Sequence, residues 1–543
     1  MNTKALKQKI LDLAIHGKLL PLEKVEKIRK EEPASGLLEK IRAEKQEKIA
    51  KGELKKDKND SFIFVGDDKR HYEKFADGSV KDIKDEIPFD VPDGWSWCRL
   101  GEICFNIKRG KSPKYTDKST IIAFAQKCNQ KEGPTSLDKA LYIDESTLKK
   151  YPDTEKLQFN DTVINSTGTG TLGRVGLFNC TIPQNVNAVY PDSHVTTVRT
   201  LQNINKIYTF YFIKNSQPYL ESMGEGSTNQ KELKPDTINN MFFPLPPLAE
   251  QQLIVAEIEK IFAQIDLLEQ NKTDLQTAIK QAKSKILDLA IHGKLVPQDP
   301  NDEPASVLLE KIRTEKEAKI AKGELKRDKN NSYIYKGSDN CHYEKLNGKD
   351  VCIEDELPFA IPDNWQWCRL GECSTIISKG TTPKGGKNAY TTDGVNFLRI
   401  ENLSDNGSIN HSNISHISFE EHESNLKRSK LEEGDLLISI AGTLGKIGFV
   451  TKTDLPMNTN QAIAFVRLQK NIFDNMFLKY AIESPSINSN LLSKTKVTSI
   501  PNLTLEMISD CLIPVPPLTE QQRIVSKIEE LFSLLDQIQT NLI

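Results

Sequence analysis

Apolar residues recur at alternating steps of four and three along the middle of the chain. Only Lys272 interrupts the series, which predicts a helix with one apolar stripe and is typical of a coiled coil. At 1.5 Å per residue this helix is about 50 Å long. The residues of the stripe are Ile254, Ile258, Ile261, Ile265, Leu268, Leu275, Ile279, Ala282, Ile286 and Leu289.

The two ends of the chain repeat this stripe in two pieces. Either piece alone would leave apolar surface in water, at a cost of about 25 cal/mol per Å². We therefore expect the terminal helices to lie end to end and to pack against the central helix. Their stripe residues are Ile524, Ile528, Leu531 and Leu535 near the C-terminus and Ile10 and Leu13 near the N-terminus.

Near-identical words frame two halves of the chain. PLPPLAEQQLIVAEIEKIF begins at Pro244 and returns as PVPPLTEQQRIVSKIEELF from Pro514. DGWSWCRLGEI begins at Asp93 and returns as DNWQWCRLGEC from Asp363. Between these frames only scattered words match, which is the pattern of one scaffold that presents two different surfaces.

Local signals predict where the helices of the frame begin and end. Thr519 and Gln522 have the spacing of a capping box at the start of the C-terminal helix. Gly17 and Gly293 each follow a last apolar position and suit a left-handed helix cap.

The interiors between the frames are β-rich and punctuated by glycine, which predicts mixed strand and loop. Matching polar words occur in both: IKRGKSPK and ISKGTTPK (from Ile107 and Ile377), TGTLGRVG and AGTLGKIG (from Thr169 and Ala441), QNVNAV and NTNQAI (from Gln184 and Asn458), and MGEGSTNQKELK and LSKTKVTSIPNL (from Met223 and Leu492). Lys, Arg and glycine N–H groups hold phosphates, while Asn, Gln and Arg pair with base edges. The plainer alternative is that these turns only close hairpins and their polar residues are solvated.

Composition limits the classes of function. Lys and Arg total 73 against 75 Asp and Glu, so the net charge of −2 excludes nucleic-acid binding through bulk basicity. The nine cysteines include no CxxC pair and predict intracellular thiols. No apolar run approaches the roughly 20 residues that span a membrane, and the chain starts on an amphipathic pattern rather than a signal peptide. We expect a soluble, cytoplasmic protein with no membrane partner.

Three other motifs are outweighed by their context. Gly168, Gly170 and Gly173 spell the dinucleotide fingerprint GxGxxG, but a strand rather than a helix follows them. The word GTLGK in the second interior is two residues short of a phosphate-binding loop. A third group consists of three neighbouring histidines, which fit a hydrophilic loop better than a metal site: His411, His416 and His422.

Taken together, these words resemble the specificity subunit of type I restriction-modification enzymes. The resemblance rests on four kinds of segment: the two that contain EQQ (from Pro244 and Pro514, the EQQ words), the two that contain WxWCRLGE (from Asp93 and Asp363, the tryptophan words), SKGTTPK and SIAGTLGKIG. It extends over essentially the whole chain. It implies an α+β fold with a pseudo-twofold internal repeat, in which a pair of long antiparallel coiled-coil helices separates two mixed α/β target-recognition domains.

The resemblance also implies a division of the chain. The segments are 1–21, a helix that completes the distal conserved helix; 22–90, a charged helical linker; 91–245, the first recognition domain; 246–297, the central helix; 298–360, a second charged helical linker; 361–515, the second recognition domain; and 516–543, the C-terminal helix.

In this family each recognition domain reads half of an asymmetric, bipartite site in double-stranded DNA, and the subunit is not an enzyme. The resemblance implies two methyltransferase subunits on the conserved helices, which methylate adenine with S-adenosylmethionine. Restriction/translocase subunits then join and use ATP and Mg²⁺. The chain itself is expected to bind no cofactor and no metal.

By motif position, the resemblance implies DNA contacts but no particular base-reading residue. Arg174 and Lys446 are implied phosphate ligands. The remaining positions are Lys108, Arg109, Lys111, Ser112, Lys379, Thr381 and Thr382, and, as weaker base or backbone contacts, Asn185, Asn187, Asn460 and Gln461.

Two alternatives from other classes stay open. A self-contained DNA methyltransferase would need an NPPF- or DPPY-like word to hold a flipped adenine, and the sequence has none. A coiled-coil scaffold that binds only proteins gives no reason for two divergent β-rich domains. The charged segments 23–86 and 302–356, predicted to be helical around 37–54 and 307–325, are either solvated inserts or docking surfaces for a partner subunit.

Overall fold

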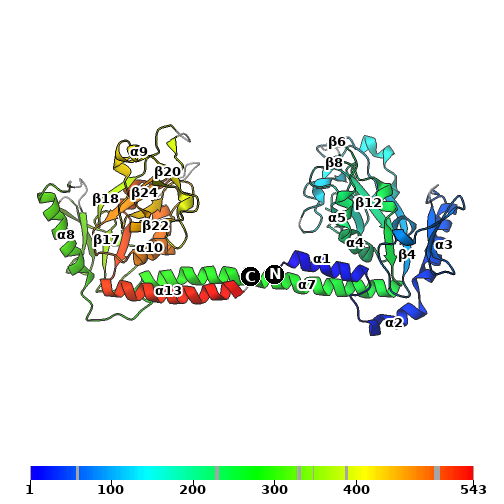
Figure 1. Ribbon diagram of the computed structural model, residues 1–543, viewed down its shortest axis with the longest axis horizontal. Coiled ribbons are helices and arrows are strands. Elements are labelled where there is room, and N and C mark those ends of the chain that lie inside the picture. Colours follow the sequence, from blue (N-terminus) through cyan, green and yellow to red (C-terminus); the bar gives the residue numbers. More distant parts are fainter. Residues whose placement is uncertain are drawn as a thin grey trace. The chain divides into compact units, whose positions relative to one another are not determined.

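The computed structural model describes residues 2–56, 60–131, 133–226, 231–325, 327, 332–346, 348–385, 389–493 and 502–541. The chain divides within helix α7 (Leu248–Ile291) into unit 1, Met1–Asn271, and unit 2, Lys272–Ile543. Figure 1 labels many of the elements of each unit. In the described part of the chain, no helix is both long and apolar enough to cross a membrane.

Unit 1 combines helices and short strands. Its helices besides α7 are α1 (Thr3–Ile15), α2 (Leu22–Glu31), α3 (Ala34–Ala50), α4 (Lys206–Asn215), α5 (Gln217–Ser222) and α6 (Pro235–Asn239). Its strands are β1 (Ser61–Val65), β2 (His71–Phe75), β3 (Val80–Asp82), β4 (Ser96–Arg99), β5 (Cys104–Arg109), β6 (Tyr115–Thr116), β7 (Ile121–Phe124), β8 (Leu141–Ile143), β9 (Asp161–Asn165), β10 (Val175–Phe178), β11 (Ala188–Pro191), β12 (Val195–Thr200) and β13 (Phe242–Leu245).

Unit 2 has a corresponding series. Its helices are α8 (Ala305–Ala321), α9 (Phe419–Glu423), α10 (Asn475–Glu483), α11 (Pro485–Ser493), α12 (Leu505–Ser509) and α13 (Leu518–Asn541). Its strands are β14 (Ser332–Lys336), β15 (His342–Leu346), β16 (Lys349–Cys352), β17 (Gln366–Arg369), β18 (Ser374–Lys379), β19 (Val395–Leu398), β20 (Ser415–Ile417), β21 (Leu436–Ser439), β22 (Ile447–Phe449), β23 (Met457–Thr459), β24 (Ile463–Leu468) and β25 (Leu512–Val515).

The sheets of the two units have matching strand orders. The main antiparallel sheet is β10-β9-β12-β5 in unit 1 and β18-β24-β21-β22 in unit 2, which is the same order written from the other edge. A second sheet contains the parallel pair β11 and β7 in unit 1, or β23 and β19 in unit 2. A third, two-stranded sheet pairs the tryptophan word with the strand before the long helix, as β4 with β13 and β17 with β25.

The central strands are covered on both faces. Every residue of β9 and β12 is buried, so their side chains, mostly apolar or hydroxyl-bearing, do not alternate between a buried and an exposed face. In unit 1 a buried ion pair joins them, with Arg199 Nη2 2.6 Å from Asp161 Oδ2. In unit 2 the half-buried Arg467 pairs with the buried Asp435, with Nη2 2.8 Å from Oδ2. These equivalent pairs fix the register for comparing the two units.

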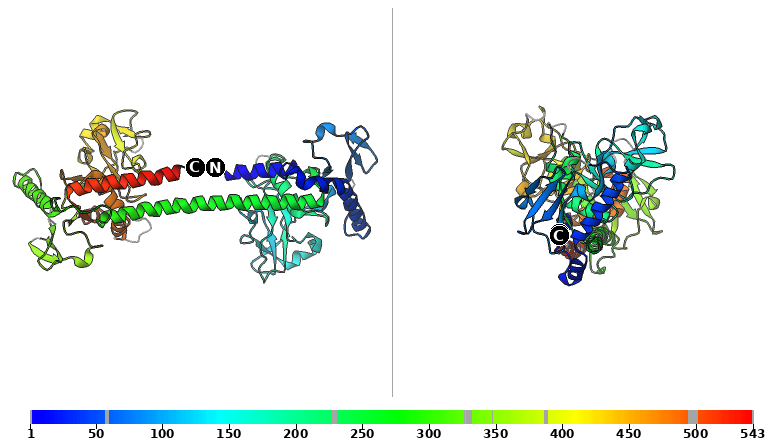
Figure 2. Two further views of the ribbon diagram at one scale, coloured as in Figure 1. Left: turned by 90° about the horizontal axis from the view of Figure 1, so that it is seen from below. Right: turned by 90° about the vertical axis from the view of Figure 1, so that its right-hand side faces the viewer.

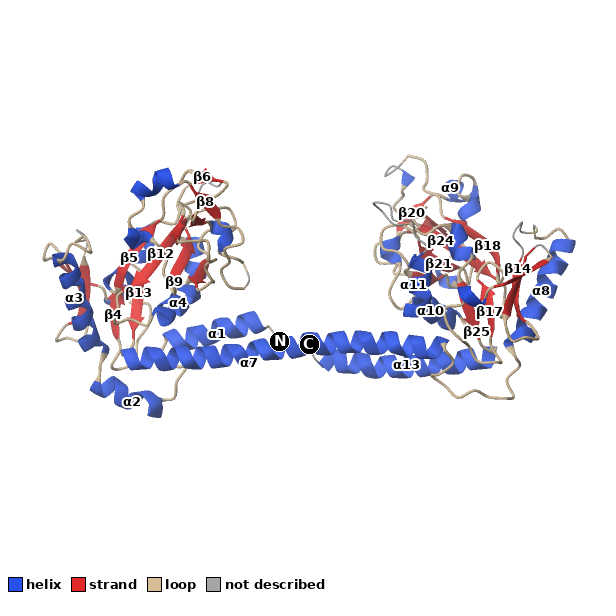
Figure 3. Cartoon of the chain, turned by 180° about the vertical axis from the view of Figure 1, so that it is seen from behind, coloured by secondary structure: helices blue, strands red, loops and turns tan. Residues whose placement is uncertain are grey.

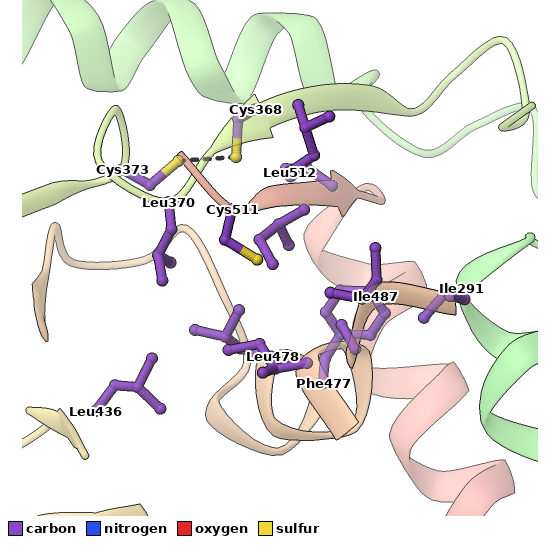
Figure 4. Packing of buried hydrophobic residues seen from close by; sticks show 14 of the residues in the cluster. Ile291, Cys368, Leu370, Cys373, Leu436, Phe477, Leu478, Ile487, Cys511 and Leu512 are labelled. Atoms are coloured by element: carbon purple, nitrogen blue, oxygen red, sulfur yellow. Dashed lines mark hydrogen bonds between the residues drawn. The ribbon is translucent and has the colours of Figure 1, made fainter. Parts of the chain in front are cut away.

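Each unit has a main core that includes the long helices. In unit 2 this core contains Ile291 of α7 together with Leu436 of β21 and Phe477 of α10. Figure 4 shows this packing, with the Cys368 and Cys373 Sγ atoms joined by a 3.2 Å hydrogen bond. The long helices are therefore part of the globular core at their ends.

The N-terminal helix packs against the first half of α7 within unit 1. Thr3 donates to Glu269, while Lys7 forms an ion pair with Asp266 and lies 5.4 Å from the centre of the Phe262 ring. The two helices therefore run antiparallel there. Figure 2 shows α1 beside this part of α7.

The C-terminal helix makes the corresponding contact within unit 2. Lys283 of α7 lies 2.6 Å from Asp536 of α13 and 5.0 Å from the centre of the Phe532 ring. Each terminal helix thus contacts the central helix within its own unit. The end-to-end placement of the two termini stays a prediction.

The predicted apolar stripe is buried only in part. The side chains of Leu268 and Leu275 are 53% and 38% exposed, in disagreement with a continuous buried stripe. Leu268 lies level with the start of α1, because Thr3, the first residue of that helix, contacts Glu269. Buried stripe residues are Ile254, Ile258, Ile265, Ile279, Ile524 and Ile528; half-buried ones are Ile10, Leu13, Ile261, Ile286, Leu289, Leu531 and Leu535.

The charged segments fold as more than helices. After α3 or α8, each forms a three-stranded antiparallel sheet, β1-β2-β3 or β14-β15-β16, in place of the helix and linker predicted there. These strands are short, and lysine and glutamate runs surround them. Their alternation of aromatic and polar residues is therefore too brief to predict a strand from the sequence. Figure 3 shows β14 beside α8.

These modules attach to the frame through buried carboxylates. Arg42 Nε lies 2.7 Å from Glu102 Oε1, and Arg313 Nε lies 2.8 Å from Glu372 Oε1. Both glutamate side chains are at most 5% exposed. Of the two alternatives for these segments, that of solvated inserts is therefore wrong for the faces that carry these contacts.

Of the predicted helix ends, the glycine caps are confirmed and the capping box is wrong. Gly17 and Gly293 have φ values of 66° and 65°, which confirms their left-handed caps. Helix α13 begins at Leu518, so Thr519 lies inside its first turn and donates to Asp302. The predicted capping box of Thr519 and Gln522 is wrong because the helix starts directly after the prolines.

Candidate nucleic-acid interface

A tight turn follows the edge strand of the main sheet in each unit. Gly110 follows β5 and its N–H donates to the Val195 carbonyl; Gly380 follows β18 and donates to the Ile463 carbonyl. A Cβ on either glycine would lie 2.1 Å from a backbone carbonyl oxygen. Glycine is therefore required by the close approach of two backbone segments, independently of any ligand.

In unit 1 the side chains around this turn form a network of cations and carboxylates. Lys108 and Lys111 both pair with the buried Glu155, with Lys111 Nζ 3.1 Å from Oε2. Arg109 pairs with Glu232 and donates from Nε to the Ser193 carbonyl.

Two buried groups lie under this network. Tyr151 donates to the Lys111 carbonyl at 2.9 Å, and burial raises the pKa of Tyr151 to about 12. Burial also raises the pKa of Asp192, against the opposing effect of the His194 N–H and of the charges of His194 and Arg109. The base of the turn is thus fixed by buried polar contacts.

In unit 2 the same turn is nearly uncharged. Thr381 donates its N–H to the Thr459 carbonyl, and Thr382 donates its hydroxyl to Gln461. The side chain of Lys379 is exposed and has no ion-pair partner among the residues that the structure describes. Ser112 donates to the Ser193 hydroxyl at 2.9 Å in the position that Thr382 and Gln461 occupy in unit 2.

The strand register corrects one pairing of words. QNVNAV was matched to NTNQAI, but the carbonyls that Gly110 and Gly380 bind make Val195 equivalent to Ile463. Asn460 and Gln461 therefore correspond to Asp192 and Ser193. The matched asparagines misled because two short polar words carry too little information to fix a register that backbone hydrogen bonds set. Asn185 and Asn187 lie earlier, exposed before β11.

The two cations after the TGTLG and AGTLG turns are held by backbone carbonyls. Arg174 Nη1 donates to the Asn129 carbonyl at 3.0 Å and Nη2 to the Gly170 carbonyl at 3.3 Å. Lys446 Nζ donates to the Leu403 carbonyl at 3.3 Å. Their role as phosphate ligands stays a prediction.

Several site residues had no signal in the sequence. Glu155, Glu232 and Ser193 lie far along the chain from the IKRGKSPK stretch, yet the fold brings them to it. The residues 227–230 and 494–501 of the last pair of words lie outside the described residues.

The motifs that suggested other chemistry have structural roles. Gly168, Gly170 and Gly173 all have positive φ in a tight turn that leads into β10. His411 pairs with Asp454 at 2.7 Å, and the buried His422 contacts Asn458. His416 lies in β20. The described residues include no group of three or more metal-ligand side chains that could hold an ion.

The EQQ words attach each long helix to its domain. Trp95 Nε1 donates to Glu250 at 2.9 Å, and Trp365 Nε1 donates to Glu520 at 3.0 Å. The next glutamine in each word donates to a proline carbonyl before the helix, Gln251 at 2.9 Å. These contacts explain why the EQQ and tryptophan words are repeated together.

The two units therefore define an α+β protein whose β-rich domains carry differently substituted turns on the same backbone. A family model described as "Type I restriction modification DNA specificity domain" matches residues 92–277 and 362–543. The EcoAI specificity subunit of Escherichia coli, a type I restriction enzyme, is 28% identical, covering 98% of this chain and 90% of its own length. The EcoEI specificity subunit of Escherichia coli is 27% identical, covering 99% and 90%.

A solved structure supports the fold. It is described as "Structural basis underlying complex assembly and conformational transition of the type I R-M system" and superposes with a TM-score of 0.54 at 16% identity, covering 84% of this chain and 94% of that chain. The chain belongs to the type I restriction-modification DNA specificity family. It is a specificity subunit, the non-catalytic, DNA-recognition component of a restriction-modification complex.

Proposed function

We propose that the two recognition domains, 91–245 and 361–515, each read one half of an asymmetric, bipartite DNA site. The observation that supports this most is the turn after β5 and β18, which has the same backbone contacts in both units but different side chains. An identical scaffold with different donors is suited to two different half-sites. The proposed contacts are Lys108, Arg109, Lys111, Ser112, Arg174, Asn185, Asn187, Lys379, Thr381, Thr382, Lys446, Asn460 and Gln461.

We further propose that the long helices act as an antiparallel coiled-coil spacer in a pseudo-twofold molecule and dock two methyltransferase subunits. Apolar side chains left exposed on these helices support docking: Leu267 is 60%, Leu268 53%, Leu534 51% and Ile538 46% exposed. Large apolar side chains left exposed on a protein surface mark protein contacts when they gather in patches. In this proposal the methyltransferase subunits use S-adenosylmethionine, the restriction/translocase subunits use ATP and Mg²⁺, and this chain binds neither cofactor.

The test is a map of methylated adenines in DNA from cells with and without this gene. The proposal predicts one asymmetric, split sequence that is methylated only when the gene is present. Replacing residues 91–245 with a domain of another member should change one half of that sequence and leave the other half unchanged. An unchanged methylation map on deletion would contradict the proposal, as would a change in both halves on replacement of one domain.

A further inference from the structure

The guanidinium of Arg109 is held at two sides. Nε donates to the Ser193 carbonyl and Nη1 pairs with the Glu232 carboxylate. The described residues supply no partner for Nη2. The Arg109 side chain is 26% exposed and that of Glu232 47% exposed, so solvent reaches this ion pair. Nη2 is the guanidinium nitrogen left to donate to a ligand.

The positive charge of this turn is offset by carboxylates. Three cations, Lys108, Arg109 and Lys111, face Glu155 and Glu232, and Arg109 also interacts electrostatically with the buried Asp192. Binding to phosphate depends on net charge and on the release of counterions. A turn with balanced charge gains little from that effect, whereas the directed N–H groups of a fixed guanidinium retain their hydrogen-bonding geometry.

Unit 2 supplies the matched comparison. Two residues after Glu155 and after Ser429, a leucine N–H donates to the same position of the parallel strand, which makes Glu155 equivalent to Ser429. The leucines directly after Glu232 and Asn502 likewise donate to equivalent carbonyls just beyond β9 and β21, which makes Glu232 equivalent to Asn502. The counterpart of Arg109 is the exposed Lys379. The carboxylates and the extra cations are thus present together in unit 1 and absent together in unit 2. This pattern keeps the net charge low and adds directed donors only in unit 1.

Building on the proposed function, we propose that Arg109 is a specificity-determining residue of the first recognition domain and that Glu232 is its positioning residue. Arg109 donates to acceptors on a base edge, and guanine, with O6 and N7 side by side, is the base that a guanidinium fits best. Glu232 sets the plane of the guanidinium and prevents it from moving to a phosphate. Lys379, an exposed ammonium that pairs with no carboxylate in the described part of the chain, contributes charge but no base preference.

The first experiment uses the complete methyltransferase complex assembled with wild-type subunit, Arg109→Gln, Arg109→Lys or the control Lys379→Gln. Methylated adenines are mapped, and discrimination at each base pair is measured. Arg109→Gln should lose about 10- to 100-fold discrimination at one base pair of one half-site, with the other half-site unchanged. Arg109→Lys should lose part of it, and Lys379→Gln should weaken binding to all sequences equally.

The second experiment uses the methyltransferase complex that carries Glu232→Gln and a DNA duplex that lacks the recognition sequence. It measures how the affinity of this complex for that duplex depends on salt. Removing the carboxylate should tighten this non-specific binding and steepen the slope of log K against log salt by about 0.9. If the ion pair between Arg109 and Glu232 only stabilises the fold, Glu232→Gln would lower the unfolding temperature without changing the salt slope.

Three outcomes would overturn the inference: an unchanged sequence preference in Arg109→Gln, a uniform loss of affinity with a shallower salt slope in that variant, or an unchanged slope in Glu232→Gln. If Arg109→Gln fails to fold, Arg109→Lys and Glu232→Gln decide. A wild-type complex that shows no sequence-specific methylation would instead refute the proposed function, so the two failures are distinguishable.

Discussion

At the scale of single residues, backbone proximity and burial decide which side chains the fold tolerates. Gly110 and Gly380 allow two backbone segments to meet beside the main sheet, and Glu102 and Glu372 lie buried where the charged modules dock. Neither the glycines nor the carboxylates need a ligand to explain them. Their effects are therefore measurable on the subunit alone.

Replacing either glycine with alanine should destabilise its unit. The new Cβ would lie 2.1 Å from a backbone carbonyl oxygen, which cannot move without breaking strand pairing. We expect Gly110→Ala and Gly380→Ala each to lower the free energy of unfolding by about 1–3 kcal/mol, measured by chemical denaturation. Gly36→Ala is the control, because its Cβ would meet nothing within 4 Å in helix α3; it should stabilise by about 0.5–1 kcal/mol. Equal effects at all three positions would contradict the clash.

The buried Glu372 should make stability depend on pH. Burial raises its pKa from 4.5 to about 7, although Arg313 opposes the shift. The folded state thus holds this proton more tightly than the unfolded state, so the stabilisation is present below pH 4.5 and is lost as pH rises to about 7. The Glu372→Gln variant should therefore gain about 3 kcal/mol relative to wild type between these pH values.

The measurement is the free energy of unfolding of both proteins across that pH range. The exposed Glu315 on α8 provides the control, since Glu315→Gln should follow wild type at every pH. A difference between Glu372→Gln and wild type that does not change with pH would remove the argument.

At the scale of elements, one glutamate at the start of each long helix bonds to the tryptophan of its domain. In unit 1 Glu250 also pairs with Arg29, with Nη2 2.6 Å from Oε1 and side chains 9% and 1% exposed. In unit 2 the second partner of Glu520 is the neutral Gln298, at 2.6 Å. The same glutamate thus balances a buried charge in one unit only.

Removing this glutamate should therefore cost more in unit 1. Glu250→Ala leaves the guanidinium of Arg29 buried without a counter-ion, a loss of about 3–5 kcal/mol. Glu520→Ala leaves only neutral donors unsatisfied, a loss of about 1–3 kcal/mol. Denaturation of both variants measures the difference. The double variant of Glu250→Ala with Arg29→Met should recover part of the loss; no recovery would show that the charge is not the cause.

At the scale of the whole molecule, the net charge of −2 means that binding to DNA depends on local surfaces and on partner subunits. Non-specific attraction to phosphates grows with net positive charge and falls with salt. The charge-balanced turn in unit 1 adds little to it.

We therefore expect the isolated subunit to bind DNA weakly and in a salt-sensitive way, and the complex with methyltransferase subunits to bind much more tightly. Titration of one labelled duplex at about 50 and 200 mM salt measures both. Negligible binding of the complete complex to any DNA at low salt would contradict the DNA-recognition role.

The sequence predicted the repeat, the helices that frame it and the strands of the interiors. Helical periodicity and repeated words are local properties, so Ile254, Ile258, Ile524 and Ile528 were correctly predicted to be buried. The sheets of the charged modules were missed because their strands are short and surrounded by lysine and glutamate.

What the sequence by itself determined is therefore the repeated scaffold. It showed which segments repeat, where Gly17 and Gly293 end their helices, and that one scaffold carries two different interior segments. Only the tertiary structure decided the chemistry of the turns. It brought Glu155 and Glu232 to a word far away in the chain and made Ser193, rather than an asparagine of the QNVNAV word, the equivalent of Gln461. The physical reason is that strand register and the pairing of distant charges depend on backbone hydrogen bonds and burial, which no short stretch of sequence contains.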